Sequence, residues 1–213
     1  KHIEQKWNEI LKESQNANAK IPRCLYKSED LVEKMLMDLT DKGIEKVIVN
    51  DSTDYNEINH IKKENKEYKD LSIVVKGEET IFDIYDLEQQ IQKINNRKIW
   101  LKCGGYITID KTEALTAIDV NTGKYTGNKT MEDTVFKVNK EATIEIAKQL
   151  RLRDIGGIII IDYIDMQKEE DKQEIEKILR EELKKDRSKT QIEGFTKLDL
   201  MELTRKHICS HKD

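Results

Sequence analysis

Segment 113–130, EALTAIDVNTGKYTGNKT, joins an apolar run typical of a β-strand to a turn rich in Gly, Asn and Thr. Asp119 lies in the middle of the run, between Ile118 and Val120, and Asn121 follows it. A buried carboxylate is costly unless it is paired, hydrogen-bonded or bound to a cation. The segment therefore predicts a strand that holds a charged site.

A second acid has the same kind of position. Asp162 ends the apolar run of segment 157–163, GIIIIDY, which is typical of a strand covered on both faces. A single acid at a strand end is commonly a structural residue bonded to backbone amides. Two acids on neighbouring strands repel each other unless a cation lies between them. Mg²⁺ suits such a pair, because it takes one or two carboxylates and completes its shell with water and phosphate oxygens.

Asn121 is predicted to assist Asp119. Residues two apart in a strand project from the same face, so the amide can donate a hydrogen bond that orients the carboxylate. An ordinary turn Asn before Thr122 and Gly123 is an equal alternative. The stretch Gly123–Thr130 also approaches the phosphate-binding pattern G-x-x-x-x-G-K-[ST], with Asn128 in place of the second Gly, so a nucleotide site there is a remote alternative.

The composition limits the class of protein. The chain has 213 residues and a net charge of -4, with 38% charged residues, so we expect a soluble protein with one or two cores. A free-standing nucleic-acid binder is usually basic, so any such role must depend on local patches. No apolar run is long enough to span a membrane. The three Cys residues are odd in number and scattered, which favours a cytoplasmic location.

Hydrophobic periodicity predicts an α/β chain with a boundary near residue 95. Before it, helices alternate with short strands; after it come three strands in quick succession, with Gly104 and Gly105 at a tight turn. Helices are expected over 2–15, 28–43, 55–66, 80–94, 130–152 and 169–186, and strands over 45–51, 71–77, 97–104, 106–112, 113–121 and 157–163.

Three longer segments resemble the catalytic core of the ribonuclease E/G family. They are GGYITIDKTEALTAIDVNTG (104–123), NKEATIEIAKQLRLRDIGGIIIIDYIDM (139–166) and LKKDRSKTQIEGFTKLDLMELTRK (183–206). Acids, glycines and the helix end QLRLRD all match the family's pattern. Residues 1–103 resemble the segment that precedes this core more loosely, in the order of elements.

This resemblance implies a Mg²⁺-dependent endoribonuclease, with Mn²⁺ as an alternative metal, that cuts single-stranded RNA and leaves 5′-phosphate and 3′-hydroxyl ends. It assigns the metal to Asp119 and Asp162 and the supporting role to Asn121. It implies a DNase I-like subdomain of mixed sheet over 95–207, preceded by a partial RNase H-like subdomain over 26–94. Residues 1–25 would be the trailing helix of a 5′-sensing domain, and 208–213 a tail.

The chain also departs from the family's pattern. The family's OB-fold RNA-binding domain, the arginine-bearing part of its sensor and its C-P-x-C zinc link have no counterpart here, so we expect a fragment or a short member. His207, Cys209 and His211 alternate in the tail but lack the spacing of a structural zinc site, and no zinc is expected. A homo-oligomer stays possible. The alternative to an enzyme is a module that binds RNA or protein without cutting it.

Basic residues near two helix ends are further candidates. Arg151, Arg153, Arg187 and Lys189 would contact RNA phosphates if they flank the metal, although cations at helix C-termini are also favourable by themselves. Asp165 lies three residues past Asp162 and is a candidate to support the metal ligands, or to cap the next helix.

Overall fold

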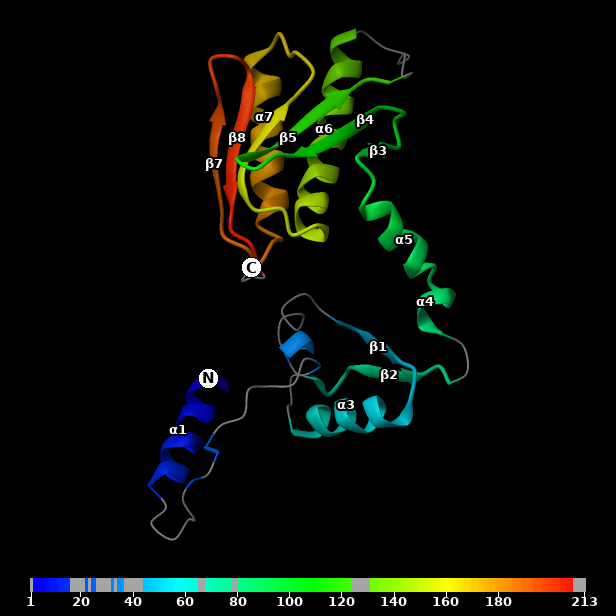
Figure 1. Cartoon of the computed structure of the whole chain (residues 1–213), viewed down its shortest axis with the longest axis vertical. Helices are drawn as coiled ribbons and strands as arrows, with labels where there is room; N and C mark the ends of the chain where they lie inside the picture. Colours follow the sequence, from blue (N-terminus) through cyan, green and yellow to red (C-terminus); the bar gives the residue numbers. More distant parts are fainter. Residues whose placement is uncertain are drawn as a thin grey trace. The chain divides into compact units, whose positions relative to one another are not determined.

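The computed structural model describes residues 2–15, 22, 24–25, 32, 34–36, 44–64, 68–77, 80–123 and 131–208. The chain divides into two compact units, residues 1–87 and 88–213, which are drawn in Figure 1. Because the two units are not placed relative to each other, each is described by itself. The predicted subdivision into a sensor-derived helix, an RNase H-like part and a DNase I-like part stays a prediction.

The first unit contains a small parallel βαβ arrangement. Its described elements are α1 (His2–Ser14), β1 (Lys46–Val49), α3 (Ser52–Glu64), β2 (Ser72–Val75) and α4 (Ile81–Ile84). β1 pairs in parallel with β2, and α3 forms the connection between them. The core of this unit comprises Leu36, Val49, Ile58, Ile61, Tyr68 and Leu71. The helix predicted over 28–43 lies largely outside the described residues.

The prediction of a single helix over 80–94 is wrong, because the structure has two helices there, α4 and α5 (Leu87–Ile94). Asp86 lies between them with φ of 50°, in the left-handed region that interrupts a right-handed helix. The apolar stripe continues across this break, so periodicity alone could not detect it. The second compact unit begins at residue 88, within α5, and the predicted boundary near 95 stays a prediction.

The second unit is built on a mixed sheet, which confirms the α/β class predicted from the sequence and the mixed sheet that the resemblance implies. Its elements after α5 are β3 (Lys98–Trp100), β4 (Tyr106–Lys111), β5 (Leu115–Asn121), α6 (Met131–Leu152), β6 (Gly157–Asp162), α7 (Glu169–Leu183), β7 (Thr190–Phe195) and β8 (Leu200–Arg205). Among the described residues the strand order is β3-β4-β5-β6-β8-β7. Within that set only β5 and β6 are parallel, and α6 connects them. The β7–β8 hairpin was not predicted.

Helices α6 and α7 lie side by side against one face of this sheet (Figure 1). Every second residue of the central strands points into the core under them, including Ile118, Val120, Ile159 and Ile161. The residues between them line the other face, which no described element of this unit covers. The prediction that β6 is covered on both faces is therefore wrong for this unit, and Ile158 keeps 51% of its surface exposed.

α6 ends at a residue other than glycine. The amide of Ile155 donates to the Leu150 carbonyl at 3.0 Å, and Asp154 adopts φ of 46°. This is the hydrogen-bond pattern with which helices commonly end at a glycine in the left-handed region. An acid at this position is useful because the Asp154 carboxylate accepts bonds from Arg205 Nη1 at 2.8 Å and from the Ile208 amide.

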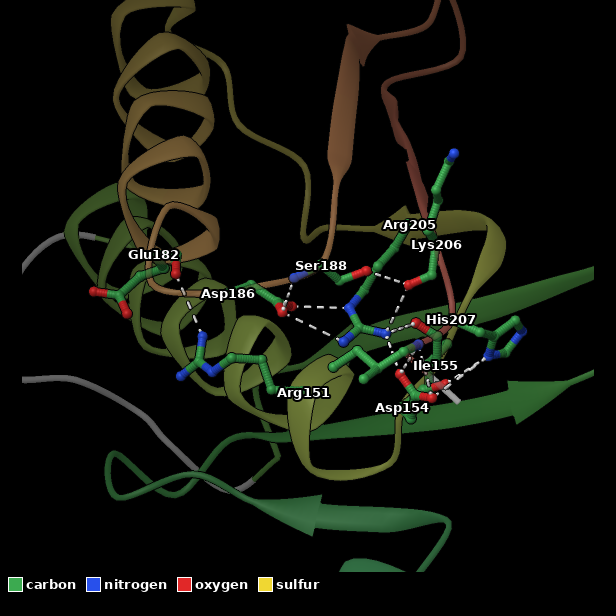
Figure 2. A network of polar contacts seen from close by, with 10 residues as sticks. Arg151, Asp154, Ile155, Glu182, Asp186, Ser188, Arg205, Lys206 and His207 are labelled. Carbon is green, nitrogen blue, oxygen red and sulfur yellow. Dashed lines mark hydrogen bonds and ion pairs between the residues drawn. The ribbon is translucent and has the colours of Figure 1, made fainter. Parts of the chain in front are cut away.

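Arg205, at the end of β8, joins several chain segments in the interior (Figure 2). Its Nε donates to Asp186 Oδ2 at 2.8 Å, and its Nη1 donates to the Ile155 carbonyl at 2.9 Å as well as to Asp154. The side chains of Arg205 and Asp186 are 0% and 1% exposed. A buried charge that loses its partner costs about 3–5 kcal/mol.

We therefore predict that Arg205→Met lowers the free energy of unfolding by about 3–5 kcal/mol, because Asp186 is left buried without its cation. Arg180 is the matched control: its Nη2 lies 2.6 Å from Glu176 Oε1, but the pair is on the surface. Arg180→Met should cost no more than about 1 kcal/mol. Denaturant unfolding of the two variants compares them directly. Equal losses of unfolding free energy would show that the buried Arg205 ion pairs stabilise the fold no more than a surface pair.

Candidate metal centre

Asp119 and Asp162 lie side by side on neighbouring strands. They are register partners in the parallel pair of β5 and β6, at the carboxyl ends of both strands. Both side chains are exposed on the open face, because their neighbours Ile118 and Ile161 point into the core. The two carboxylates that the sequence analysis singled out are thus brought together at one edge of the sheet.

Asn121 is hydrogen-bonded to one of these acids. Its Nδ2 donates to Asp119 Oδ2 at 2.6 Å. Asn121 is also the last residue of β5. It therefore lies beside Asp119 and directly before the turn, as both alternatives from the sequence require. The hydrogen bond leaves the second carboxylate oxygen of Asp119 available to another ligand.

Negative charges lie close together at this site. Burial raises the pKa of the Asp162 carboxyl above its ordinary value, and the negative charges of Asp119 and Asp165 raise it further. The fold thus places acids where their ionised forms repel each other. A bound cation removes this repulsion, which is the electrostatic reason to expect one.

Buried polar groups of α6 hold the loop after Asp162 in place. Asn139 is fully buried; its Nδ2 donates to the Ile164 carbonyl at 2.8 Å, and its Oδ1 accepts from the Ile164 amide at 3.1 Å. The hydroxyls of Thr143 and Tyr163 form a hydrogen bond of 2.9 Å. Tyr163 is 4% exposed, and burial raises the pKa of its phenol. Tyr163 therefore packs in the core, and these contacts hold the chain on which Asp162 ends.

The donors that this site offers to a metal ion are the carboxylate oxygens of Asp119 and Asp162. Within the described residues, no group of three or more His, Cys, Asp or Glu side chains is arranged to hold a metal. Two oxygen ligands, with the remaining positions left to water and phosphate, are the usual provision for Mg²⁺. Cys209 and His211, of the tail, lie outside the described residues, and so does most of the Gly123–Thr130 stretch with its remote nucleotide-site alternative.

Asp165 lies near the pair and not within it. It contributes to a pocket of about 450 Å³ between the start of α6 and the β6–α7 loop, whose lining includes Met131, Val135 and Lys168. After burial and the charge of Asp119, the negative charge of Asp165 also raises the pKa of the Asp162 carboxyl. The supporting role predicted for Asp165 stays a prediction.

The four basic residues lie at the other end of the sheet. Arg151 donates to the Glu182 carbonyl at 3.3 Å, and Arg153 donates to the Asn96 carbonyl at 2.8 Å. Arg187 and Lys189 precede β7, whose first residue, Thr190, pairs with Arg205 opposite Gly157. The length of β6 separates that edge from Asp162, roughly 16 Å at the usual rise per residue. The structure thus does not place these cations beside the acids, and their contact with RNA stays a prediction.

Sequence reasoning missed side chains that share the open face with the acids. Lys98 and Trp100 are two residues apart in β3, and Tyr106 and Thr108 are two residues apart in β4, so each pair projects from one face. Arg97, just before β3, pairs with Asp110, whose hydrogen bond and charge raise the pKa of the Arg97 guanidinium, and the charge of Asp119 adds to this. The signal was present in the sequence, because residues two apart in a strand project from one face.

A pair of adjacent carboxylates on an open sheet face is typical of proteins that bind a divalent cation and phosphate groups. Comparison with known proteins gives the family. The sequence model of the Ribonuclease E/G family matches residues 1–208, and the chain belongs to this family.

Relatives of known name agree with this assignment. Ribonuclease G of Salmonella typhimurium (strain SL1344) is 38% identical over 210 residues, which cover 96% of this chain and 42% of that protein. Ribonuclease G of Haemophilus influenzae is 38% identical over 94% of this chain and 40% of its own length. Ribonuclease E of the same organism is 33% identical over 95% of this chain and 22% of its own length.

The chain thus spans less than half the length of these relatives. What the whole proteins do comes to this chain only as a proposal. In the part of the chain that the structure describes, no helix is long and apolar enough to cross a membrane.

We predict that Asp119→Asn and Asp162→Asn each leave the metal-free protein at least as stable as the parent at neutral pH. Each substitution removes one of two repelling charges, a gain of no more than about 1 kcal/mol at an exposed site. The folded state raises the pKa of Asp162, so ionisation of this carboxyl destabilises the folded state, and it does so only above the ordinary pKa of 3.8. The stability gained by Asp162→Asn therefore disappears in acid.

Denaturant unfolding without divalent cations, at neutral pH and again near the ordinary pKa of an aspartate, measures this. Asp70→Asn is the control, because that carboxylate belongs to the first unit and its side chain is 90% exposed. A large loss of stability in either site variant would mean that its carboxylate is a structural residue and not part of a strained site.

Proposed function

We propose that this chain is the catalytic core of a Mg²⁺-dependent endoribonuclease that cuts single-stranded RNA. The observation that supports it most is the register pairing of Asp119 with Asp162 at the open carboxyl ends of β5 and β6. Membership of the ribonuclease E/G family gives the reaction class. Mn²⁺ is the alternative metal, since it accepts the same oxygen ligands.

In this proposal Asp119 and Asp162 hold the cation. A Mg²⁺ ion held by these carboxylates would supply Lewis-acid chemistry for phosphodiester hydrolysis, through a polarised phosphate oxygen and a water molecule of lowered pKa. Asn121 keeps Asp119 in one orientation through its hydrogen bond of 2.6 Å, so that the carboxylate need not reorganise when RNA arrives. Asn139 has the corresponding role for Asp162, because it fixes the backbone at Ile164, two residues further along.

The open face gives an RNA strand access to both acids. Asp119 and Asp162 are exposed, and the core lies entirely on the helix side of the sheet. A chain with a net charge of -4 needs local cations to attract phosphate: Lys98 lies on this face, and the Arg97 guanidinium is paired with Asp110 of the same face. A cytoplasmic setting and assembly with further copies are part of the same proposal, by analogy with what the family resemblance implies.

We predict that Asp119→Asn and Asp162→Asn reduce Mg²⁺-dependent cleavage of single-stranded RNA to background, because each removes one of two protein ligands. Asn121→Ala should lower activity by about 10- to 100-fold, the usual effect of losing a residue that orients a metal ligand. Asp70→Asn should leave the rate unchanged. Gel analysis of a labelled oligoribonucleotide gives the rates, and Mn²⁺ binding by electron paramagnetic resonance gives the occupancy of the site independently of activity.

Two results would contradict the proposal. Full cleavage by Asp119→Asn or Asp162→Asn would remove that residue from the site. Tight metal and RNA binding without any cleavage would favour the alternative, a module that binds RNA and does not cut it. The cleavage assay should be repeated after addition of the segments that the longer relatives have. This distinguishes weak RNA binding from the lack of a catalytic site.

We also predict weak binding of single-stranded RNA by this chain. Its net charge is -4 and the cations on the open face are few, so the dissociation constant at physiological salt should be about 10⁻⁴ to 10⁻⁶ M, the range of non-specific binding. Fluorescence anisotropy of a labelled oligonucleotide measures it. Nanomolar binding at that salt would mean that a further RNA surface exists on this chain.

A further inference from the structure

An aromatic pair with a lysine over it lies on the open face of the sheet. The rings of Trp100 and Tyr106 meet edge to face, with centroids 5.3 Å apart and planes inclined by 62°. Lys98 Nζ lies 4.2 Å from the centroid of Trp100 and 3.5 Å from that of Tyr106. Trp100 nevertheless keeps 60% of its surface exposed, although an indole is among the costliest side chains to leave in water.

The strand register places this group beside the candidate metal centre. Trp100 pairs with Tyr106, and Tyr106 pairs with Asn121, so the three lie in one row across the sheet. The adjacent row contains Lys98, Thr108, Asp119 and Asp162. Neighbouring strands are about 4.8 Å apart, so β3 lies roughly 10 Å from the strand that holds Asp119. The group and the two acids therefore share a single face within the reach of one or two nucleotides.

We propose that Trp100, Tyr106 and Lys98 form a nucleotide subsite next to the cleavage centre. A base of single-stranded RNA stacks on the Trp100 indole, Tyr106 supports the indole from its edge, and the Lys98 ammonium pairs with a backbone phosphate. The choice of RNA as ligand rests on the proposed function, whereas the subsite itself rests on the contacts and the register given above.

The chemistry of the group favours a nucleic acid over a protein partner. Grooves that bind single strands combine aromatic side chains, on which bases stack, with cations that follow the backbone. Lysine is depleted at the centre of protein–protein interfaces, where an ammonium loses its water without gaining a partner. Here the lysine lies at the centre of the aromatic group. A phosphodiester chain supplies both a ring to stack and an anion for the lysine.

The chain offers a direct optical test, because it contains 2 Trp residues, and the other, Trp7 in α1, is 58% exposed. Trp7→Phe leaves Trp100 as the single indole, and Trp100→Phe leaves Trp7. Each variant is titrated with single-stranded oligouridylate of roughly ten nucleotides, within the site sizes of known single-strand grooves, and without divalent cations to prevent cleavage. We expect the fluorescence of Trp7→Phe to be quenched by stacking and that of Trp100→Phe to stay unchanged.

Affinity measurements separate stacking from charge. Trp100→Ala should weaken oligouridylate binding by about tenfold, Trp100→Tyr should largely restore it, and an oligomer of the same length without bases should bind both alike. Lys98→Met should reduce the salt slope of log K by about 0.7, the contribution of one phosphate contact on a single strand. Lys177→Met is the matched control, since Lys177 is an exposed lysine of α7, on the helix side of the sheet; its slope should equal that of the parent.

The outcomes distinguish this subsite from the proposed function. Cleavage with unchanged affinity in Trp100→Ala would overturn the subsite and leave the nuclease intact. Quenching of Trp100 by oligouridylate without any cleavage would support the subsite and count against the nuclease. A Trp100 signal that changes with protein concentration in the absence of RNA would show that the aromatic group contacts a second copy of the chain, and would overturn the subsite.

Discussion

The parallel pairing of β5 with β6 is the constraint on which the candidate site depends. Side chains alternate between the two faces of a strand, and both strands bury every second residue under α6 and α7. The register Asp119–Asp162 then places both carboxylates on the open face and at the same edge. A slip of one residue in either strand would exchange an isoleucine with an acid between core and solvent, so the packing of the core fixes the geometry of the charges.

Polar networks hold the two ends of β6 in different ways. At the carboxyl end, the Asn139 amide and the Thr143 hydroxyl of α6 hold the chain at Tyr163 and Ile164. At the amino end, Arg205 ties the end of α6 to the segment before β7 (Figure 2). The first network uses neutral groups and leaves the field at the acids unchanged. The second uses a buried ion pair at the opposite edge, where its charge is far from the phosphate that the site would bind.

The sequence indicated the two acids, Asn121 and α6 because each depends on local pattern. Strand alternation places Asn121 beside Asp119 on one face whatever the rest of the fold does, and the apolar stripe of α6 has the helical period. It did not indicate that Ile158 is exposed, because the run GIIIID has the same composition whether one face is covered or two. That depends on which elements pack against the sheet.

The position of the basic residues and the last hairpin also required the fold. A helix that connects two parallel strands runs back along the sheet, so the end of α6, with Arg151, lies at the edge opposite Asp162. β7 and β8 contain Glu193 and Glu202 among apolar residues, and this mixture gave no clear period. Trp100 and Lys98 could have been found, because their alternation along β3 predicts a shared face.

The strand order has a consequence for biosynthesis. β8 is inserted between β6 and β7, although both are made before it. Until the ribosome has released residues 200–205, β6 is a sheet edge with unpaired backbone groups and an isoleucine-rich sequence, the kind of edge that pairs with other chains. A nascent chain interrupted after α7 would expose that edge beside a finished parallel pair and so be prone to aggregate. Translation through β8 therefore completes the pairing of β6. Termination even a few residues before Arg205 would leave β6 unpaired and so favour aggregation.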